Sequence, residues 1–311
     1  MLLFIFLNIV VTAALAANSS FVHDYHLSSE DIRFLQSLPR VKAGTRLPGF
    51  KYLYLEAGSH LTAVLNPAHS QLEIAGSPHT SQHALNIAAD TVMKMTKYMP
   101  ASMFQTLTRG SVGVFTAAEK LIIYPEMASL ANGNCGTSCT GACSHTCTFD
   151  GRKYENIGGL TNSRSVILDD NVLCSPQDPH RHTSNILVHE FGHLVHAYAA
   201  TPAIKTQITS AYNAAKQHQT WQLNTYAMAN EHEYWAMATA TFFGVTHESD
   251  SNTGGMNHCG TNFCAGVQQA RDHLRQKDPA LFNILSHVYT NNQPTLNPGI
   301  PICPSGSVVV G

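Results

Sequence analysis

The feature that most constrains the fold of this chain is the HEFGH segment at residues 189–193, which lies within a run of apolar residues at helical spacing. Two histidines four residues apart project from the same face of a helix, so His189 and His193 can bind one tetrahedrally coordinated metal ion. Glu190 would lie beside that ion, where its carboxylate can accept a proton from an attacking water molecule. The segment therefore predicts a helix over residues 184–200 that holds one zinc ion per chain.

A catalytic zinc ion needs a third protein ligand and an open position for water. In the metzincin pattern a glycine follows the second histidine by three residues and a further histidine follows it by six. Those positions hold His196 and Ala199 in this chain, so the sequence excludes that clan. His196 is rotated away from the two motif histidines on a helix. We therefore expect it at the helix surface or next to the ligands, not on the metal.

The third ligand is expected within Asn230–Ala236, a carboxylate-bearing part of a predicted helix over residues 229–243. Glu231 and Glu233 lie roughly 200° apart around a helix, so only one of them can face the metal. The helix face of Glu233 carries small residues that permit close packing against the zinc helix, whereas the face of Glu231 is bulkier. We therefore expect Glu233 to bind the metal and Glu231 to be a capping or surface carboxylate.

Tyr226 precedes Glu233 by seven residues, which is nearly two helical turns. If the helix begins early enough, the phenol of Tyr226 lies over the same face as the glutamate. It could then donate a hydrogen bond to the oxyanion of a tetrahedral intermediate. The alternative is an ordinary buried tyrosine, and the spacing alone favours neither interpretation.

The pattern along the 311-residue chain predicts one α+β domain, with a small mixed sheet followed by a mainly helical C-terminal half. We expect residues 79–311 to form the zinc-binding domain, and residues 17–78 to form an N-terminal extension that precedes it or packs on it. Short strands are expected at residues 50–55, 61–65, 72–75, 112–115, 121–124 and 165–168. Helices are expected at residues 79–99, 184–200, 203–217, 229–243, 265–276 and 279–289.

The N-terminus has the pattern of a secretory signal peptide. Residues 2–15 form an apolar run followed by the small-x-small sequence that ends at Ala16, so residues 1–16 are expected to be removed. The run is short for a membrane span, which is the alternative. Asn18 lies in the chain's glycosylation sequon, at the expected mature N-terminus. We therefore expect a secreted, extracellular glycoprotein that has no membrane contact in its mature form.

The cysteines and the net charge agree with that interpretation. The eight cysteines are an even number and are expected to form disulfides, with Cys259 and Cys264 close together across a short glycine-containing loop. Four of the cysteines recur within residues 135–147, where the interleaved glycine, serine and threonine favour a disulfide-stapled loop over a metal cluster. The net charge of −2 offers no electrostatic basis for binding nucleic acid or an anionic membrane.

At these residues a family resemblance becomes visible. The HEFGHLVHAYA segment, Tyr226 and the NEHEYWA segment together resemble the gluzincin metallopeptidases of the anthrax lethal factor type, and their secreted eukaryotic relatives. The resemblance covers about residues 80–290, and its two metal motifs are its specific part. It implies a zincin-like metallopeptidase domain. It also implies that His189, His193 and Glu233 are the zinc ligands, Glu190 the general base and Tyr226 the oxyanion donor.

The chain departs from this family pattern at one position. The lethal factor type carries a second glutamate four residues after the glutamate ligand, and Met237 occupies that position here. Groups that support the metal ligands must therefore come from elsewhere, or the support is weaker.

The leading functional hypothesis is a secreted zinc endopeptidase that acts on a peptide or protein substrate. A strand over residues 165–168 is expected to form the sheet edge on which an extended peptide is held. The alternative is a secreted structural or binding protein with a non-catalytic zinc site. The intact Glu190 argues against that alternative, because zinc binding alone does not require this carboxylate.

Overall fold

The protein is described by a computed structural model, which covers residues 28–38, 45–148 and 151–304. The expected signal peptide, its cleavage site and the sequon at Asn18 lie outside the described residues. None of the helices in the described ranges has the length and the apolar character that crossing a lipid bilayer requires.

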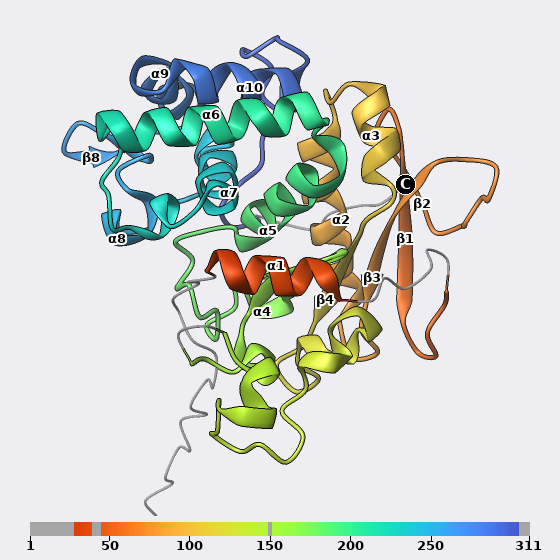
Figure 1. Cartoon of the computed structure of the whole chain (residues 1–311). Coiled ribbons are helices and arrows are strands. Elements are labelled where there is room, and N and C mark those ends of the chain that lie inside the picture. The colour runs from red at the N-terminus through yellow and green to blue at the C-terminus, as the bar shows by residue number, and fades with distance from the viewer. Residues whose placement is uncertain (1–27, 39–44, 149–150, 305–311) are drawn as a thin grey trace, which may run out of the picture.

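A six-stranded mixed sheet forms the first half of the fold (Figure 1). Its order is β2-β1-β3-β4-β6-β5, with β3, β4 and β6 parallel and the other pairs antiparallel. The first three strands come from the predicted N-terminal extension, so that segment shares one sheet with the strands that follow it. The strands are β1 Lys51–Glu56, β2 His60–Thr62, β3 Gln71–Gly76, β4 Ser111–Phe115, β5 Gly159–Thr161 and β6 Arg164–Leu168.

Two helices cover one face of this sheet. Helix α2 (Gln82–Thr96) packs on β1, β3 and β4, and helix α5 (Ile186–Leu194) packs on β5 and β6 and also contacts α2. The two shorter helices of this half are α3 (Ala101–Leu107) and α4 (Asp169–Val172). The predicted helix over residues 79–99 thus ends at Thr96, and α3 follows it after Pro100 as a separate helix that the sequence pattern did not predict.

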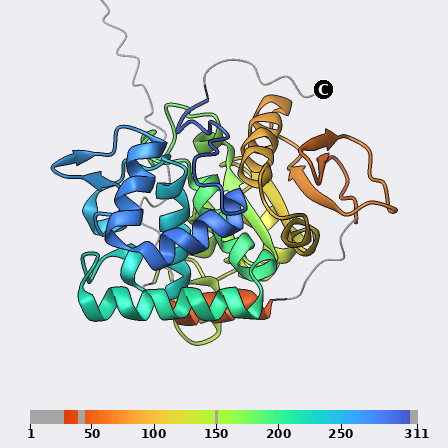
Figure 2. The ribbon, with the colours of Figure 1, turned by 90° about the horizontal axis from the view of Figure 1, so that it is seen from above.

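The second half of the chain is helical and lies beside the sheet half (Figure 2). A short helix near the N-terminus, α1 (Ser29–Ser37), lies on the outside of the body in both views. The remaining elements are α6 Pro202–His218, α7 Glu231–Phe242, α8 Asp250–Thr253, the hairpin β7 His258–Cys259 with β8 Asn262–Phe263, α9 Val267–Lys277 and α10 Pro279–Thr290. The predicted α+β class is therefore confirmed.

The predicted strand over residues 121–124 is wrong. Leu121–Ile123 form a 3-10 helix, and the buried Tyr124 that follows donates its phenolic hydrogen toward the backbone oxygens of Ala75 and Val114, at 2.9 and 2.7 Å. The segment thus lies over the sheet instead of within it. A Cβ at Gly113 would lie 2.6 Å from the Tyr124 ring, so this close approach requires glycine. Local apolar character could not distinguish these two arrangements.

The prediction that the strand at residues 165–168 forms the sheet edge is also wrong. Strand β6 is internal, because β4 pairs with one side of it and β5 with the other. The strand at this edge of the sheet is β5. Its three residues are too few to give a recognisable sequence pattern.

The cysteines are all paired in the described part of the chain, as predicted. Two overlapping disulfides, Cys135–Cys143 and Cys139–Cys147, staple the cysteine-rich loop. Cys259–Cys264 closes the β7–β8 hairpin, and Cys174–Cys303 ties the end of α4 to the C-terminal segment across 129 residues.

Candidate metal centre

Helix α5 carries the two motif histidines, and two asparagine side chains fix where it begins. Asn185 caps the helix, and the side-chain oxygen of Asn171 accepts a hydrogen bond from the backbone of Ile186 at 2.9 Å. The predicted helix over residues 184–200 continues past α5 as a π-helical turn, Val195–Ala199. Turns of this kind occur frequently at functional sites.

Helix α7 carries the predicted glutamate ligand, and Asn230 sets its register. The Asn230 side chain accepts hydrogen bonds from the backbone N–H groups of His232 and Glu233, both at 3.0 Å. This cap satisfies two of the free N–H groups of the first helical turn. It also holds the backbone of Glu233 in the first turn of α7.

The two helices pack closely because the fourth residue of the motif is glycine. A Cβ on Gly192 would lie 3.3 Å from the Cα of Ala236 and 3.2 Å from the Cβ of Thr239. The indole N–H of Trp235 donates to the Gly192 carbonyl oxygen at 2.9 Å and joins the two helices at the same level. The predicted small-residue face of α7 therefore does face α5.

This packing brings together three atoms that can bind a metal ion. The Nε2 atoms of His189 and His193 are 3.2 Å apart, and each lies 3.1 to 3.2 Å from Oε2 of Glu233. Tetrahedral zinc with bonds of about 2.0–2.1 Å places its ligand atoms roughly 3.3 Å apart. Two imidazoles and one carboxylate are also a donor set found in catalytic zinc sites. The residues therefore fit a zinc ion, while the geometry alone does not fix which metal is bound.

The structure separates the two candidate glutamates. Glu233 is fully buried and faces the histidines, whereas Glu231 is partly exposed and is not part of the group. Burial raises the pKa of the Glu233 carboxyl, but the adjacent His193 and His189 outweigh it and hold that pKa below its usual range.

Glu190 is buried beside this group, and the sheet edge contacts it directly. The Thr161 hydroxyl donates to Oε2 of Glu190 at 2.6 Å, and the Ser165 hydroxyl donates to the Glu190 backbone oxygen at 3.0 Å. A Cβ on Gly159 would lie 3.1 Å from the Cγ of Glu190, so the close approach of β5 depends on this glycine. Burial raises the pKa of Glu190 to about 7, although His193 and the Thr161 hydrogen bond oppose the shift.

Tyr226 reaches the site, but by a different route from the one we predicted. Helix α7 begins at Glu231, so Tyr226 lies before it in a separate 3-10 turn, Tyr226–Met228. The extended backbone of Asn230 separates the two segments. The phenolic oxygen of Tyr226 is nevertheless 3.5 Å from Nε2 of His189. Burial, followed by the nearby Glu233 and Glu190, raises the pKa of Tyr226, so the phenol keeps its proton.

His196 lies near the candidate ligands, which is one of the two locations predicted for it. Its Nδ1 is 3.1 Å from Nδ1 of His232, and the two rings are perpendicular. Burial lowers the pKa of both imidazoles. The pair lies where the π-helical turn after α5 meets α7. It contributes no atom to the group of three ligand candidates.

Sequence reasoning missed the contribution of β5 to the site. Thr161 and Gly159 contact Glu190 although roughly thirty residues separate them from it along the chain. The only local signal was the Gly158-Gly159 pair before a short apolar stretch. That pair indicates a turn, and it does not indicate which helix the strand approaches.

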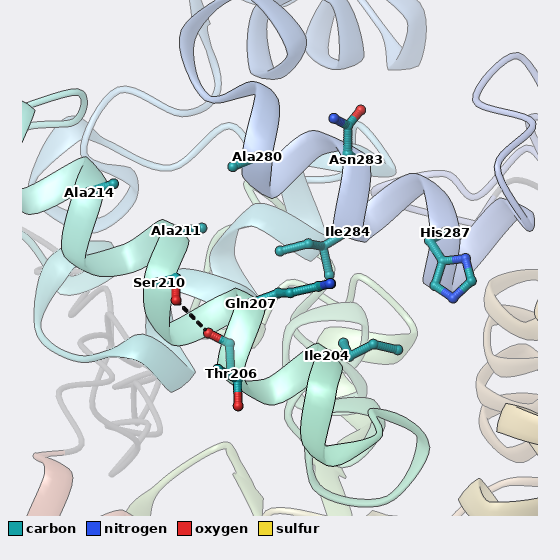
Figure 3. Close-up of a pocket in the computed structure, with 10 residues that line it drawn as sticks. All are labelled: Ile204, Thr206, Gln207, Ser210, Ala211, Ala214, Ala280, Asn283, Ile284 and His287. Atoms are coloured by element: carbon teal, nitrogen blue, oxygen red, sulfur yellow. Dashed lines mark hydrogen bonds between the residues drawn. The ribbon is translucent and has the colours of Figure 1, made fainter.

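A groove of about 670 Å³ between α6 and α10 lies apart from these residues (Figure 3). Ile204 and Gln207 of α6 and Ile284 of α10 line its centre, and His287 is the one titratable side chain among the lining residues. None of the five predicted site residues lines this groove. It offers shape without the groups that catalysis needs.

Comparisons with known proteins add little to this geometry. No protein-family model matches the sequence, and no curated protein matches it. Among solved structures, the chain is similar to the Pro-Pro endopeptidase of Paenibacillus alvei, with 15% identity and a TM-score of 0.41 over 70% of this chain and 97% of that one. So distant a similarity leaves the chemistry open. The resemblance to the lethal factor type also stays an expectation.

The geometry predicts which glutamate the metal needs. Glu233→Ala, His189→Ala and His193→Ala should each lose the metal, because two ligands cannot hold a catalytic zinc ion tightly. Glu231→Ala is the matched control and should keep it. Metal content per chain, measured after dialysis of the folded variants, checks this. Loss of metal from Glu231→Ala with retention in Glu233→Ala would contradict the arrangement of the two helices.

Proposed function

We propose that this chain is a secreted zinc-dependent endopeptidase. The observation that carries the proposal is the convergence of His189, His193 and Glu233 around one point, with Glu190 beside them. A zinc site that only stabilises the fold does not need a second carboxylate next to the ligand atoms. The four disulfides of the described residues agree with an oxidising, extracellular compartment, and we propose residues 1–16 as the signal peptide.

The residues divide the chemistry of peptide hydrolysis between them. A bound zinc ion would polarise the scissile carbonyl group and make the attacking water more acidic. Glu190 accepts the proton of that water on its carboxylate and then donates it to the leaving amine nitrogen. Its pKa of about 7 suits both steps near neutral pH. Tyr226 keeps its proton and donates a hydrogen bond to the carbonyl oxygen as negative charge develops there.

Strand β5 is the proposed binding edge for the substrate. Gly158 accepts a hydrogen bond from the backbone of Leu168, and Asn162 donates one to Arg164. In this antiparallel register the backbone groups of Gly159 and Thr161 point away from β6, toward the free edge. An extended peptide can add there as a further strand, next to Glu190.

One observation favours the alternative, a zinc site without catalysis. The site residues are almost wholly buried, as expected for a metal ion that only stabilises the fold. The two functions differ in what they require of Glu190, so substituting this residue distinguishes them.

Glu190→Gln should abolish peptidase activity while the metal content and the fold stay unchanged, because an amide cannot accept the proton from water. Hydrolysis of fluorescein-labelled casein, metal content and thermal unfolding, measured on the same preparation, check this. A fully active Glu190→Gln protein would exclude Glu190 as the base. Loss of metal would make the residue structural.

Tyr226→Phe should lower kcat by about 10²-fold with little change in KM or metal content, the effect seen when one oxyanion donor is removed. Steady-state kinetics on a synthetic peptide that spans a cleavage site of casein give both constants. An unchanged kcat would show that Tyr226 is only a packed aromatic residue.

Thr161→Val should lower kcat by about tenfold, because Glu190 loses the hydrogen bond that orients its carboxylate. Thr161→Ser keeps the hydroxyl and is the matched control, expected to stay near the parent rate. The metal content should be the same in both variants. Equal losses in the two variants would mean that Thr161 acts through packing and not through its hydroxyl.

A further inference from the structure

The proposed active site is closed in this structure. Glu233 is 0% exposed, Glu190 2%, His189 3% and Tyr226 4%, and the side chain of His193 is 12% exposed. An extended peptide that pairs with β5 has to place its scissile bond next to these groups. Such a substrate would therefore meet site residues that are almost wholly covered.

Helix α1 is fastened to the segments on both sides of β5. On the side that precedes the strand, the Tyr154 hydroxyl donates to Asp31 at 2.9 Å, and the rings of Phe34 and Tyr154 are 6.2 Å apart. On the side that follows it, Leu35 and Leu38 face Asn162 and Ser163 across a small cavity. These attachments place α1 against the segments that lead into and out of β5.

Helix α1 depends on its side-chain packing to stay folded. It has nine residues, and helices this short are marginal without packing partners. Leu35 belongs to the buried core, and Phe34 and Leu38 pack against that core. A cavity of about 280 Å³ is lined by Leu35 and Leu38 of α1 together with Tyr198 and Lys205. The helix also lies on the outside of the body in both views (Figures 1 and 2). Leu35, 1% exposed, is its buried anchor.

We propose that α1 is an intramolecular inhibitor. It covers the free edge of β5 and has to leave before an extended peptide can pair there. This inference rests on the proposed peptidase function and adds its regulation: the intact chain is a latent form, and displacement of α1 opens the binding edge. The free edge of β5 is thus occupied by α1 of the same chain until a substrate peptide replaces it.

The experiment loosens α1 in the full-length secreted protein. Leu35→Asp places a carboxylate where α1 is anchored, and Tyr154→Phe removes the hydrogen bond to Asp31 without changing shape. Arg33→Ala, on the exposed side of the same helix, is the matched control. Two quantities are measured: the rate of cleavage of fluorescein-labelled casein, and amide hydrogen exchange over residues 157–161. Thermal unfolding shows that each variant is folded.

We expect Leu35→Asp to cleave casein about tenfold faster or more, because opening no longer costs the burial of a leucine. Tyr154→Phe should show a smaller increase, and Arg33→Ala none. Exchange at residues 157–161 should accelerate in the same order.

Equal cleavage rates in an active parent and in both loosened variants would overturn the proposal, as would unchanged exchange at β5 in folded Leu35→Asp. The exchange measurement also separates this proposal from the enzymatic one. If no variant cleaves casein but exchange at β5 accelerates, the peptidase function fails while the covering of the edge by α1 stands.

Discussion

The close contact between α5 and α7 is the constraint on which the candidate site depends. Gly192 lets the two helix backbones approach, and the Trp235 hydrogen bond to its carbonyl oxygen fixes their relative height. At that height Glu233 lies level with His189 and His193. A Cβ at position 192 would require Ala236 or Thr239 to shift by a few tenths of an ångström. Glycine at this position thus permits the close contact that brings the Glu233 carboxylate to the imidazoles.

Strand β5 connects the chemistry of the site with access to it. The Thr161 hydroxyl donates a hydrogen bond to Glu190, the backbone of β5 is the proposed edge for an extended peptide, and α1 is proposed to cover that edge. Because three residues serve all these purposes, a change in the position of β5 would alter the general base and the binding edge together. The proposed inhibition by α1 and the proposed catalysis therefore both depend on the same short strand.

The candidate site was predictable from sequence where the relevant distances lie within one helix. The HEFGH spacing placed both histidines on one face, and the small-residue face of α7 selected Glu233 over Glu231. The spacing argument for Tyr226 failed, since α7 begins after it, although the residue still reaches His189 through a separate turn. Thr161 was not predicted at all, because hydroxyl residues on short strands carry no local sign of the helix they will contact.

By itself, the sequence determined the residue types of the site, the helix that presents the two histidines and the closeness of Cys259 and Cys264 across a short loop. These are consequences of spacing along a few turns of chain, where backbone geometry fixes the distances. Tertiary structure decided that β5 and not β6 lies at this edge of the sheet, that Leu121–Ile123 form a 3-10 helix before the buried Tyr124, and that Asp31 of α1 meets Tyr154. Those outcomes depend on the packing of segments far apart in the chain, and local patterning leaves such contacts open.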